Sequence, residues 1–219
     1  MLVIAVHGSA LPGADGTIDR LVHALPTPAV VGHLDLQRPG LAEVLAHRPG
    51  AVVVPLLLGD GYHRSVDLPA VARRFRCTVT PGLAGEPDVA RAVDDRLCAA
   101  GGPGDAVVVA GAGSTRPGGR DGTLAVVREL RSAHPGVRVV DAYCAGAEPT
   151  VPQRVAQLRR AGYRRISIAA HLLAPGRFTR VLEATAGVDA VSAPIADHPL
   201  IARLVLNRYE SAGPEVLAA

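Results

Sequence analysis

The feature that most constrains the fold is an alternation of short apolar runs with longer amphipathic segments, which occurs twice along the chain. In the first hundred residues, apolar runs of strand length cover 2–6, 29–34, 51–57 and 77–80. Helical spacing of apolar positions covers 17–24, 41–47, 68–74 and 88–97. In the second half, the strand-like runs cover 106–110, 137–142, 166–170 and 188–192. Strands that alternate with helices pair in parallel, so the pattern predicts an α/β protein with two tandem lobes, each built on a parallel sheet.

The two halves are related by an internal repeat. A shift of 105 residues aligns Ala5, Gly8 and Ser9 with Ala110, Gly113 and Ser114. The same shift places His7 on Ala112, and a later block of the repeat places His63 on Phe178. The glycine-rich segment 101–104 is typical of a linker, so we expect an N-terminal lobe over 1–100 and a C-terminal lobe over 105–219. The histidine positions predict one active half and one that lacks these side chains.

Composition excludes several classes of protein. The chain has 219 residues and is 48% apolar, which is enough for a substantial core. No apolar run reaches the roughly 18 to 20 residues that a membrane span needs, and we expect a cytoplasmic protein. All 23 basic residues are arginine, so lysine Schiff bases and Walker-type phosphate lysines are excluded. The net charge of +3 fits a polyanionic small molecule, and the scarcity of aromatic residues argues against nucleic acid.

The cysteines give no sign of a disulfide framework or a thiolate zinc site. Cys77, Cys98 and Cys144 are widely spaced and form no Cys-x-x-Cys pair. We expect all three to be reduced and to pack in the interior, as free cysteine commonly does.

Three polar residues follow successive apolar runs in the first half. His7 comes directly after the first run, Asp35 follows the second, and His63 lies in the segment after the third. Ligands of open parallel sheets bind beyond the carboxyl ends of the strands, so we expect these three side chains at one edge of the sheet. Taken alone, either histidine could simply cap a loop through backbone hydrogen bonds.

Three segments carry a resemblance to a known family. They are Val6-His7-Gly8-Ser9, the stretch His33-Leu34-Asp35-Leu36-Gln37-Arg38-Pro39, and the stretch from Pro55 to Pro69 that contains Gly61-Tyr62-His63-Arg64. Together they resemble the sirohydrochlorin chelatases, class II enzymes that insert Fe²⁺ or Co²⁺ into a tetrapyrrole, in their two-domain form. The resemblance implies flavodoxin-like or Rossmann-like lobes, a macrocycle bound between them, and metal insertion without ATP or an organic cofactor.

The resemblance also implies roles for individual residues. His7 and His63 would hold the metal and accept protons, since neutral imidazole suits both tasks. Asp35 stands where the family usually has glutamate, so a structural role remains open beside a catalytic one. Ser9, Arg64 and Arg177 are the candidates for contact with the macrocycle, the two arginines because they suit its carboxylates. For His171, at the end of the second half's third run, we favour packing over metal ligation.

Two alternatives remain at this point. Both Fe²⁺ and Co²⁺ accept imidazole, so the residues do not separate siroheme from cobalamin biosynthesis. A protein that carries metal or tetrapyrrole without catalysis would show the same histidines. Because one chain supplies both lobes, the ligand cleft needs no dimerisation, and we expect a monomer.

Overall fold

The computed structural model describes residues 1–8, 14–35, 37–59 and 68–212, and it contains two four-stranded parallel sheets. The first sheet has the strand order β2-β1-β3-β4. Its strands are β1 (Leu2–Val6), β2 (Ala29–His33), β3 (Val52–Pro55) and β4 (Thr78–Val79). The central strand β1 pairs with β2 from Leu2↔Ala29 to Val6↔His33, and with β3 from Leu2↔Val52 to Ala5↔Pro55. The polar residues that follow β1 and β2 therefore begin at the same edge.

The second sheet repeats this topology with the order β6-β5-β7-β8. Its strands are β5 (Ala106–Gly111), β6 (Arg138–Tyr143), β7 (Ile166–His171) and β8 (Ala190–Val191). The helices of the chain are α1 (Ala14–Ala24), α2 (Leu41–Ala46), α3 (Leu68–Arg74), α4 (Pro87–Ala99), α5 (Asp121–Ala133), α6 (Val151–Arg160), α7 (Arg177–Glu183) and α8 (Pro199–Ser211). The predicted alternation and the parallel sheets are confirmed, with strand ends within two residues of expectation in most cases.

The strands are apolar throughout because helices cover both faces of each sheet. Along β1, Leu2, Ile4 and Val6 point into one core cluster, whereas Val3 and Ala5 point into another with α2 and α3. All five residues of β1 are buried. A strand that is buried on both faces is apolar at successive positions, and for this reason the strands of both sheets could be predicted from the sequence.

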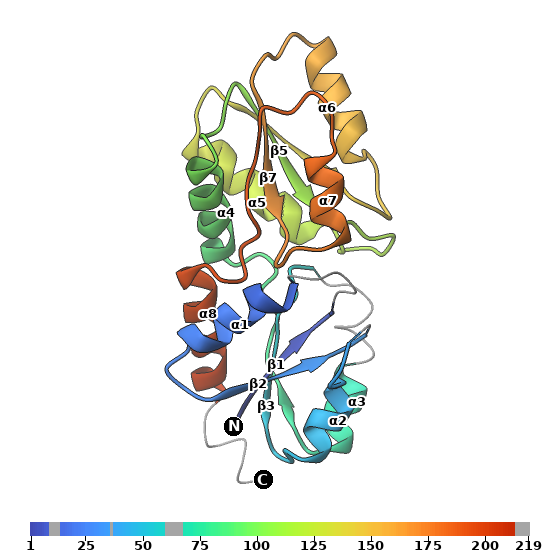
Figure 1. The fold of residues 1–219 in the computed structure, drawn as a ribbon, viewed down its shortest axis with the longest axis vertical. Coiled ribbons are helices and arrows are strands. Elements are labelled where there is room, and N and C mark those ends of the chain that lie inside the picture. Colours follow the sequence, from blue (N-terminus) through green and yellow to red (C-terminus); the bar gives the residue numbers. More distant parts are fainter. Residues whose placement is uncertain (9–13, 36, 60–67, 213–219) are drawn as a thin grey trace.

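Helices α4 and α8 are exchanged between the two sheets. Helix α4 ends the first half of the sequence but packs against β7 and α5, and α8 ends the second half but packs against β3 and α1 (Figure 1). The two helices also contact each other. One apolar cluster consequently runs from Leu2 and Ile4 of the first sheet to Val107 and Val109 of the second. The halves of the sequence share a core, and the segment 101–104 links them after α4 has already reached the second sheet.

Ion pairs fasten the exchanged helices at symmetry-related positions. Arg96 of α4 donates to Asp197, which lies just before α8, over 2.7 Å. Arg208 of α8 pairs with Glu86, which lies just before α4. The repeat aligns Arg96 with Arg208, so each exchanged helix is held near its carboxyl end by a carboxylate next to the start of the other.

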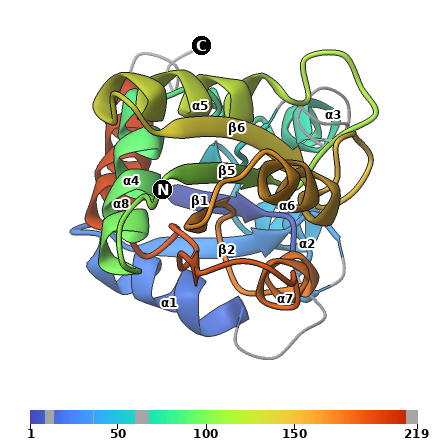
Figure 2. The same ribbon diagram turned by 90° about the horizontal axis from the view of Figure 1, so that it is seen from above.

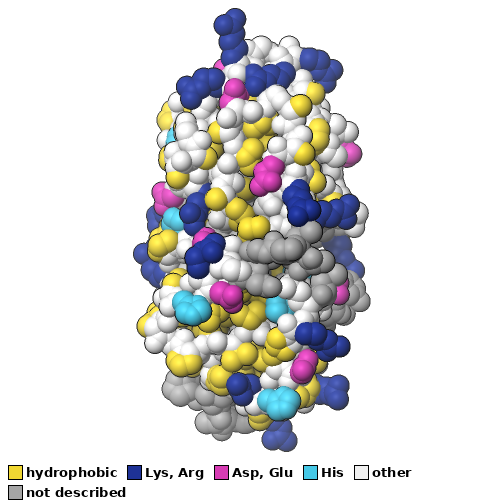
Figure 3. All heavy atoms as spheres, in the orientation of Figure 1, with side chains coloured by type: hydrophobic (Ala, Val, Ile, Leu, Met, Phe, Trp, Pro, Cys, Tyr) yellow, Lys and Arg dark blue, Asp and Glu magenta, His cyan; other side chains and the backbone are white. Residues whose placement is uncertain are grey.

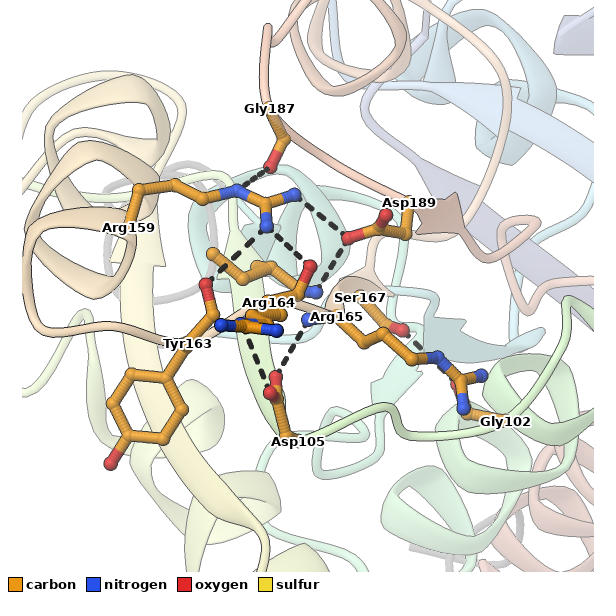
Figure 4. A network of polar contacts seen from close by, with 10 residues as sticks. Gly102, Asp105, Arg159, Tyr163, Arg164, Arg165, Ser167, Gly187 and Asp189 are labelled. Atoms are coloured by element: carbon orange, nitrogen blue, oxygen red, sulfur yellow. Dashed lines mark hydrogen bonds and ion pairs between the residues drawn. The ribbon is translucent and has the colours of Figure 1, made fainter.

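A separate polar network closes the amino-terminal edge of the second sheet (Figure 4). The carboxylate of Asp105 accepts hydrogen bonds from the backbone N–H groups of Arg164 and Arg165, each 2.9 Å long. Arg159 donates to the carbonyl oxygen of Gly187 and to the carboxylate of Asp189. These contacts pin the segments that enter β5, β7 and β8, on the edge opposite the strand ends where ligands of such sheets bind.

The three cysteines are free, as expected, but their predicted burial is only partly right. Cys77 and Cys144 are half-buried, whereas Cys98 is exposed on α4. The error arises because burial of α4 depends on a sheet from the other half of the sequence. Over the described residues, no helix combines the length and the apolar character required to cross a membrane.

Candidate active site

His7 lies immediately beyond the carboxyl end of the central strand β1, and Asp35 lies beyond the neighbouring strand β2. Leu34 donates a backbone hydrogen bond to Val6, and Asp35 donates the next one to the carbonyl oxygen of His7 over 3.0 Å. The ladder of the sheet thus continues past the strands and sets the two residues side by side. Both are exposed. The sequence prediction that His7 and Asp35 share one edge is confirmed.

Gly8 forms the turn that follows His7, and its backbone requires a residue without a side chain. Its φ is +95°, and a Cβ at this position would lie 2.3 Å from the carbonyl oxygen of Asp35. Gly113 has φ +91° and would clash in the same way with the carbonyl oxygen of Ala145. The glycine is therefore needed for close packing of the turn on the neighbouring segment, in both halves alike.

The third expected residue belongs to the segment after β3. Leu56 donates a hydrogen bond to the carbonyl oxygen of Ala5, so β3 also runs to the same edge beside β1. The strand order changes direction between β1 and β3, and such a switch point is where ligands of open α/β sheets bind. Ser9, His63 and Arg64 lie outside the described residues. Their places in the site remain predictions.

The hydrogen bonds confirm the alignment of the two halves around His7. Ala145 donates to the carbonyl oxygen of Ala112 over 2.9 Å, as Asp35 does to His7. The second half thus has alanine at both positions, with the backbone geometry retained. Phe178, which the repeat aligns with His63, packs half-buried against the core of the second lobe. Neither the alanines nor Phe178 can bind a metal ion or accept a proton.

Arg177 is exposed at the first position of α7. Figures 1 and 2 both show α7 on the side of the second lobe that lies over the carboxyl ends of β1 and β2. On the face shown in Figure 3, histidine side chains lie mainly over the first lobe beside hydrophobic ones, and arginines are spread over both lobes. Helix α7 therefore lies on the side where the ligand is expected, and contact of Arg177 with that ligand stays a prediction.

A pocket of about 430 Å³ lies at the corresponding edge of the second sheet. Its lining includes Ser114, Arg116 and Arg120 from the segment after β5, together with Glu148 from the segment after β6. The guanidinium of Arg120 also stacks over the ring of Tyr143, 5.7 Å from its centre. Sequence reasoning did not select these arginines, although their position after the repeated glycine-serine turn was a usable signal.

His171 is a buried residue at the end of β7, as the preference for packing predicted. It is 3% exposed, and its Nδ1 lies 3.1 Å from the Thr123 hydroxyl. Its Nε2 has no hydrogen-bond partner among the described residues. Burial lowers the pKa of His171 to about 4, so the ring is neutral at physiological pH. Gly122, at the start of α5, covers this ring.

Two comparisons with known proteins agree with this architecture. A protein-family model described as CbiX matches residues 1–100 and 106–212. The solved structure of SirB from Bacillus subtilis with Fe³⁺ is 22% identical, with a TM-score of 0.75, over 99% of this chain and 97% of that one. The chelatase SirB from Bacillus subtilis subspecies spizizenii in complex with cobalt is 20% identical, with a TM-score of 0.71, over 96% and 93%.

A third solved structure is CbiX, described as the terminal enzyme of siroheme biosynthesis in denitrifying bacteria. It is 15% identical, with a TM-score of 0.64, over 97% of this chain and 99% of that one. No curated protein matches the sequence. The structural likeness shows that the two-lobed fold is that of the chelatases.

Proposed function

Since the chain belongs to the CbiX family, we propose that it is a sirohydrochlorin chelatase, which inserts Fe²⁺ or Co²⁺ into its macrocycle without ATP. The two solved SirB structures are described with iron and with cobalt, so both ions are candidates here. The metal ion is a substrate of this reaction, and no organic cofactor is required. The activity would serve siroheme or cobalamin biosynthesis.

The reaction places two demands on the protein. The macrocycle loses two pyrrole N–H protons as the divalent ion enters, so charge balances when both protons leave the ring. A neutral imidazole can accept such a proton, and it also binds late first-row divalent ions. We assign His7 and His63 both tasks. Two protein ligands leave the remaining coordination positions open to water and then to ring nitrogens, and this permits release of the product.

Asp35 is the third member of this group. Its backbone is fixed to that of His7, and the residue is exposed at the same edge of the sheet. A carboxylate there can attract the incoming cation and stabilise an imidazolium that has accepted a proton. Aspartate is shorter than the glutamate common in the family, which makes this contribution the one most in need of a test.

The observation that carries the proposal is the contrast between symmetry-related positions. The two halves share the strand order, the glycine with positive φ and the backbone hydrogen bonds. The positions of His7 and Asp35, however, are occupied by Ala112 and Ala145 in the second half. If the histidine served only to cap the loop, Ala112 shows that the same backbone forms without it. The backbone at this position therefore does not depend on the imidazole.

The second half would contribute binding surface in place of catalytic groups. Sirohydrochlorin carries many carboxylates, for which arginine is the best partner. Arg177 at the start of α7 and Arg64 beside His63 would hold these groups, and Ser9 would lie against the flat ring. Because the exchanged helices already join the two lobes within one chain, we expect a monomer to be active.

The proposal is tested by metal insertion under anaerobic conditions, followed by absorbance, with Fe²⁺ and Co²⁺ in separate reactions. The intact protein should complete many turnovers, and His7→Ala or His63→Ala should reduce the rate about 100-fold or more. His23→Ala, which removes an exposed histidine of α1, is the matched control and should leave the rate unchanged. Binding of both ligands without turnover would support a carrier and overturn the proposal.

A further inference from the structure

The segment that leads from β3 toward His63 packs, backbone on backbone, against the start of α5 in the second half. A Cβ placed on Gly122 would lie 2.2 Å from the carbonyl oxygen of Leu58. A Cβ placed on Gly59 would lie 3.2 Å from the carbonyl oxygen of Gly119. The first distance is shorter than real Cβ contacts reach, and the second is tighter than most of them. The close approach therefore requires glycine at residue 122 and is eased by glycine at residue 59.

Helix α5 has no freedom to retreat from this contact. The Thr123 hydroxyl packs against Gly111, so that a Cβ placed on Gly111 would lie 2.3 Å from the hydroxyl oxygen. The same hydroxyl is hydrogen-bonded to Nδ1 of His171. Thr123 and His171 are 5% and 3% exposed. Next to them, a Cβ on Gly122 would reach within 3.5 Å of the His171 ring. The beginning of α5 is therefore locked to β5 and β7, and any added bulk must displace Leu58.

The first-half side of the contact is held by a backbone hydrogen bond at the preceding residue and by Leu58 itself, which packs half-buried against the core. Leu57 accepts a hydrogen bond of 3.0 Å from the backbone N–H of Leu83, which holds the chain as it leaves the sheet. Leu58 and Gly59 come next, and His63 follows four residues after Gly59. A displacement at Leu58 would therefore fall immediately before the sequence segment that carries the second histidine.

Among the described residues, the contact has no counterpart in the opposite direction. The repeat aligns Gly122 with Gly16 of α1 and Leu58 with Leu173, yet the described atom nearest to a Cβ on Gly16 is the end of the Arg20 side chain, at 3.7 Å. Gly59 likewise aligns with Ala174, which already has a Cβ. Within the described part of the chain, this glycine contact thus holds the segment that precedes His63 in the sequence and not the equivalent one that precedes Phe178.

We propose that Gly122 is a positioning residue, through which the second half sets the path of the Leu58–Gly59 segment, which precedes His63 by four residues in the sequence. This inference rests on the proposed function and gives the half without histidines a defined task in it. Misplacement of a reacting group by about 1 Å can reduce a rate about 100-fold. Gly122→Ala should therefore impair insertion although residue 122 carries no functional group.

The test compares Gly122→Ala with Gly16→Ala, its symmetry-related control, in the full-length protein. Gly122→Ala should lower kcat for metal insertion between about 10- and 100-fold, with little change in KM for the macrocycle. Gly16→Ala should keep the kcat of the intact protein, because no backbone atom of the described residues outside α1 lies within 4 Å of the added methyl group. Equal kcat values for the two folded variants, or a uniform loss in both, would overturn the proposal.

A second readout does not depend on activity. Amide hydrogen exchange of peptides that cover 56–59 should become faster in Gly122→Ala and remain unchanged in Gly16→Ala. If exchange is faster in Gly122→Ala but the intact protein does not insert metal, the contact is supported and the proposed function is refuted. Unchanged exchange together with normal turnover would refute the positioning role alone. If Gly122→Ala does not fold, Gly59→Ala gives a milder clash across the same contact and should show both effects to a smaller degree.

Discussion

The backbone N–H of Asp35 donates a 3.0 Å hydrogen bond to the carbonyl oxygen of His7, so the two residues of the site are fixed to each other by main chain. Ala145 and Ala112 make the same bond over 2.9 Å in the second half. The backbone here thus forms without the side chains of His7 and Asp35. We therefore expect substitutions of these two residues to change activity more than stability.

Replacement of Asp35 by asparagine keeps the backbone donor and the size of the side chain but removes its charge. We expect Asp35→Asn to lower the insertion rate by at least about 10-fold, because the carboxylate no longer supports proton acceptance by His7. Thermal unfolding should occur at the same temperature as in the intact protein, since the side chain is exposed. An unchanged rate would assign Asp35 a purely structural role. Asp35→Glu, which restores the residue usual in the family, should be active.

The exchanged helices make stability depend on Asp197. This carboxylate is 17% exposed and binds Arg96 at 2.7 Å and Arg20 at 2.8 Å. Asp197→Ala should lower the free energy of unfolding by about 1 to 3 kcal/mol, since it leaves the half-buried Arg96 unpaired. Arg20→Ala removes only the pair whose arginine is 63% exposed, and should cost less than about 1 kcal/mol. Urea unfolding measures both, and equal effects would contradict a special role for Arg96.

Burial of His171 makes the fold sensitive to acid. Its pKa is lowered to about 4 in the folded protein, against an ordinary value near 6.5, so the unfolded chain takes up a proton more readily between these two values. Stability contributed by the neutral ring is present above pH 6.5 and is lost as the pH falls toward 4. Between pH 7 and 4.5 the loss is about 2 to 3 kcal/mol. His171→Gln should remove this part of the pH dependence in urea unfolding, and an identical pH dependence would contradict it.

Asp105 contributes acid sensitivity at lower pH. Backbone hydrogen bonds, first from Arg164 and then from Arg165, hold the pKa of its carboxyl below the usual value (Figure 4). A depressed pKa contributes stability above the unfolded value, and this contribution is lost as the pH falls through the folded one. Asp105→Asn should therefore lower the melting temperature at pH 7, with a smaller difference at pH 3. A difference of the same size at both pH values would exclude the charge as its cause.

Much of the fold could be predicted from the sequence because its signals are local. Leu2–Val6 is continuously apolar, and Gly8 and Ser9 recur as Gly113 and Ser114, so both the sheet and the alignment of His7 with Ala112 followed from spacing. The exchange of α4 and α8 could not be predicted in this way. The two halves are similar, so the apolar face of either helix suits either sheet, and the choice depends on contacts far apart in the chain.

The site was likewise only partly predictable. The edge shared by His7 and Asp35 follows from the parallel order of the strands, because their carboxyl ends meet. The support given by Gly122 to Leu58 does not, since it depends on a backbone contact between residues 64 positions apart, and a lone glycine in a helix pattern carries no sign of what approaches it. The arginines after β5 follow the repeated glycine and serine in the sequence, which was a usable signal, but the pocket that they line is visible only in the folded chain.

We propose that the two halves have the same framework but that only the first carries the chemistry. The most direct measurement is the initial rate of Co²⁺ insertion by single variants at the two aligned positions, His7→Ala and Ala112→Ser. The account predicts a loss of about 100-fold or more for the first and an unchanged rate for the second. Comparable rates in the two folded variants would contradict it.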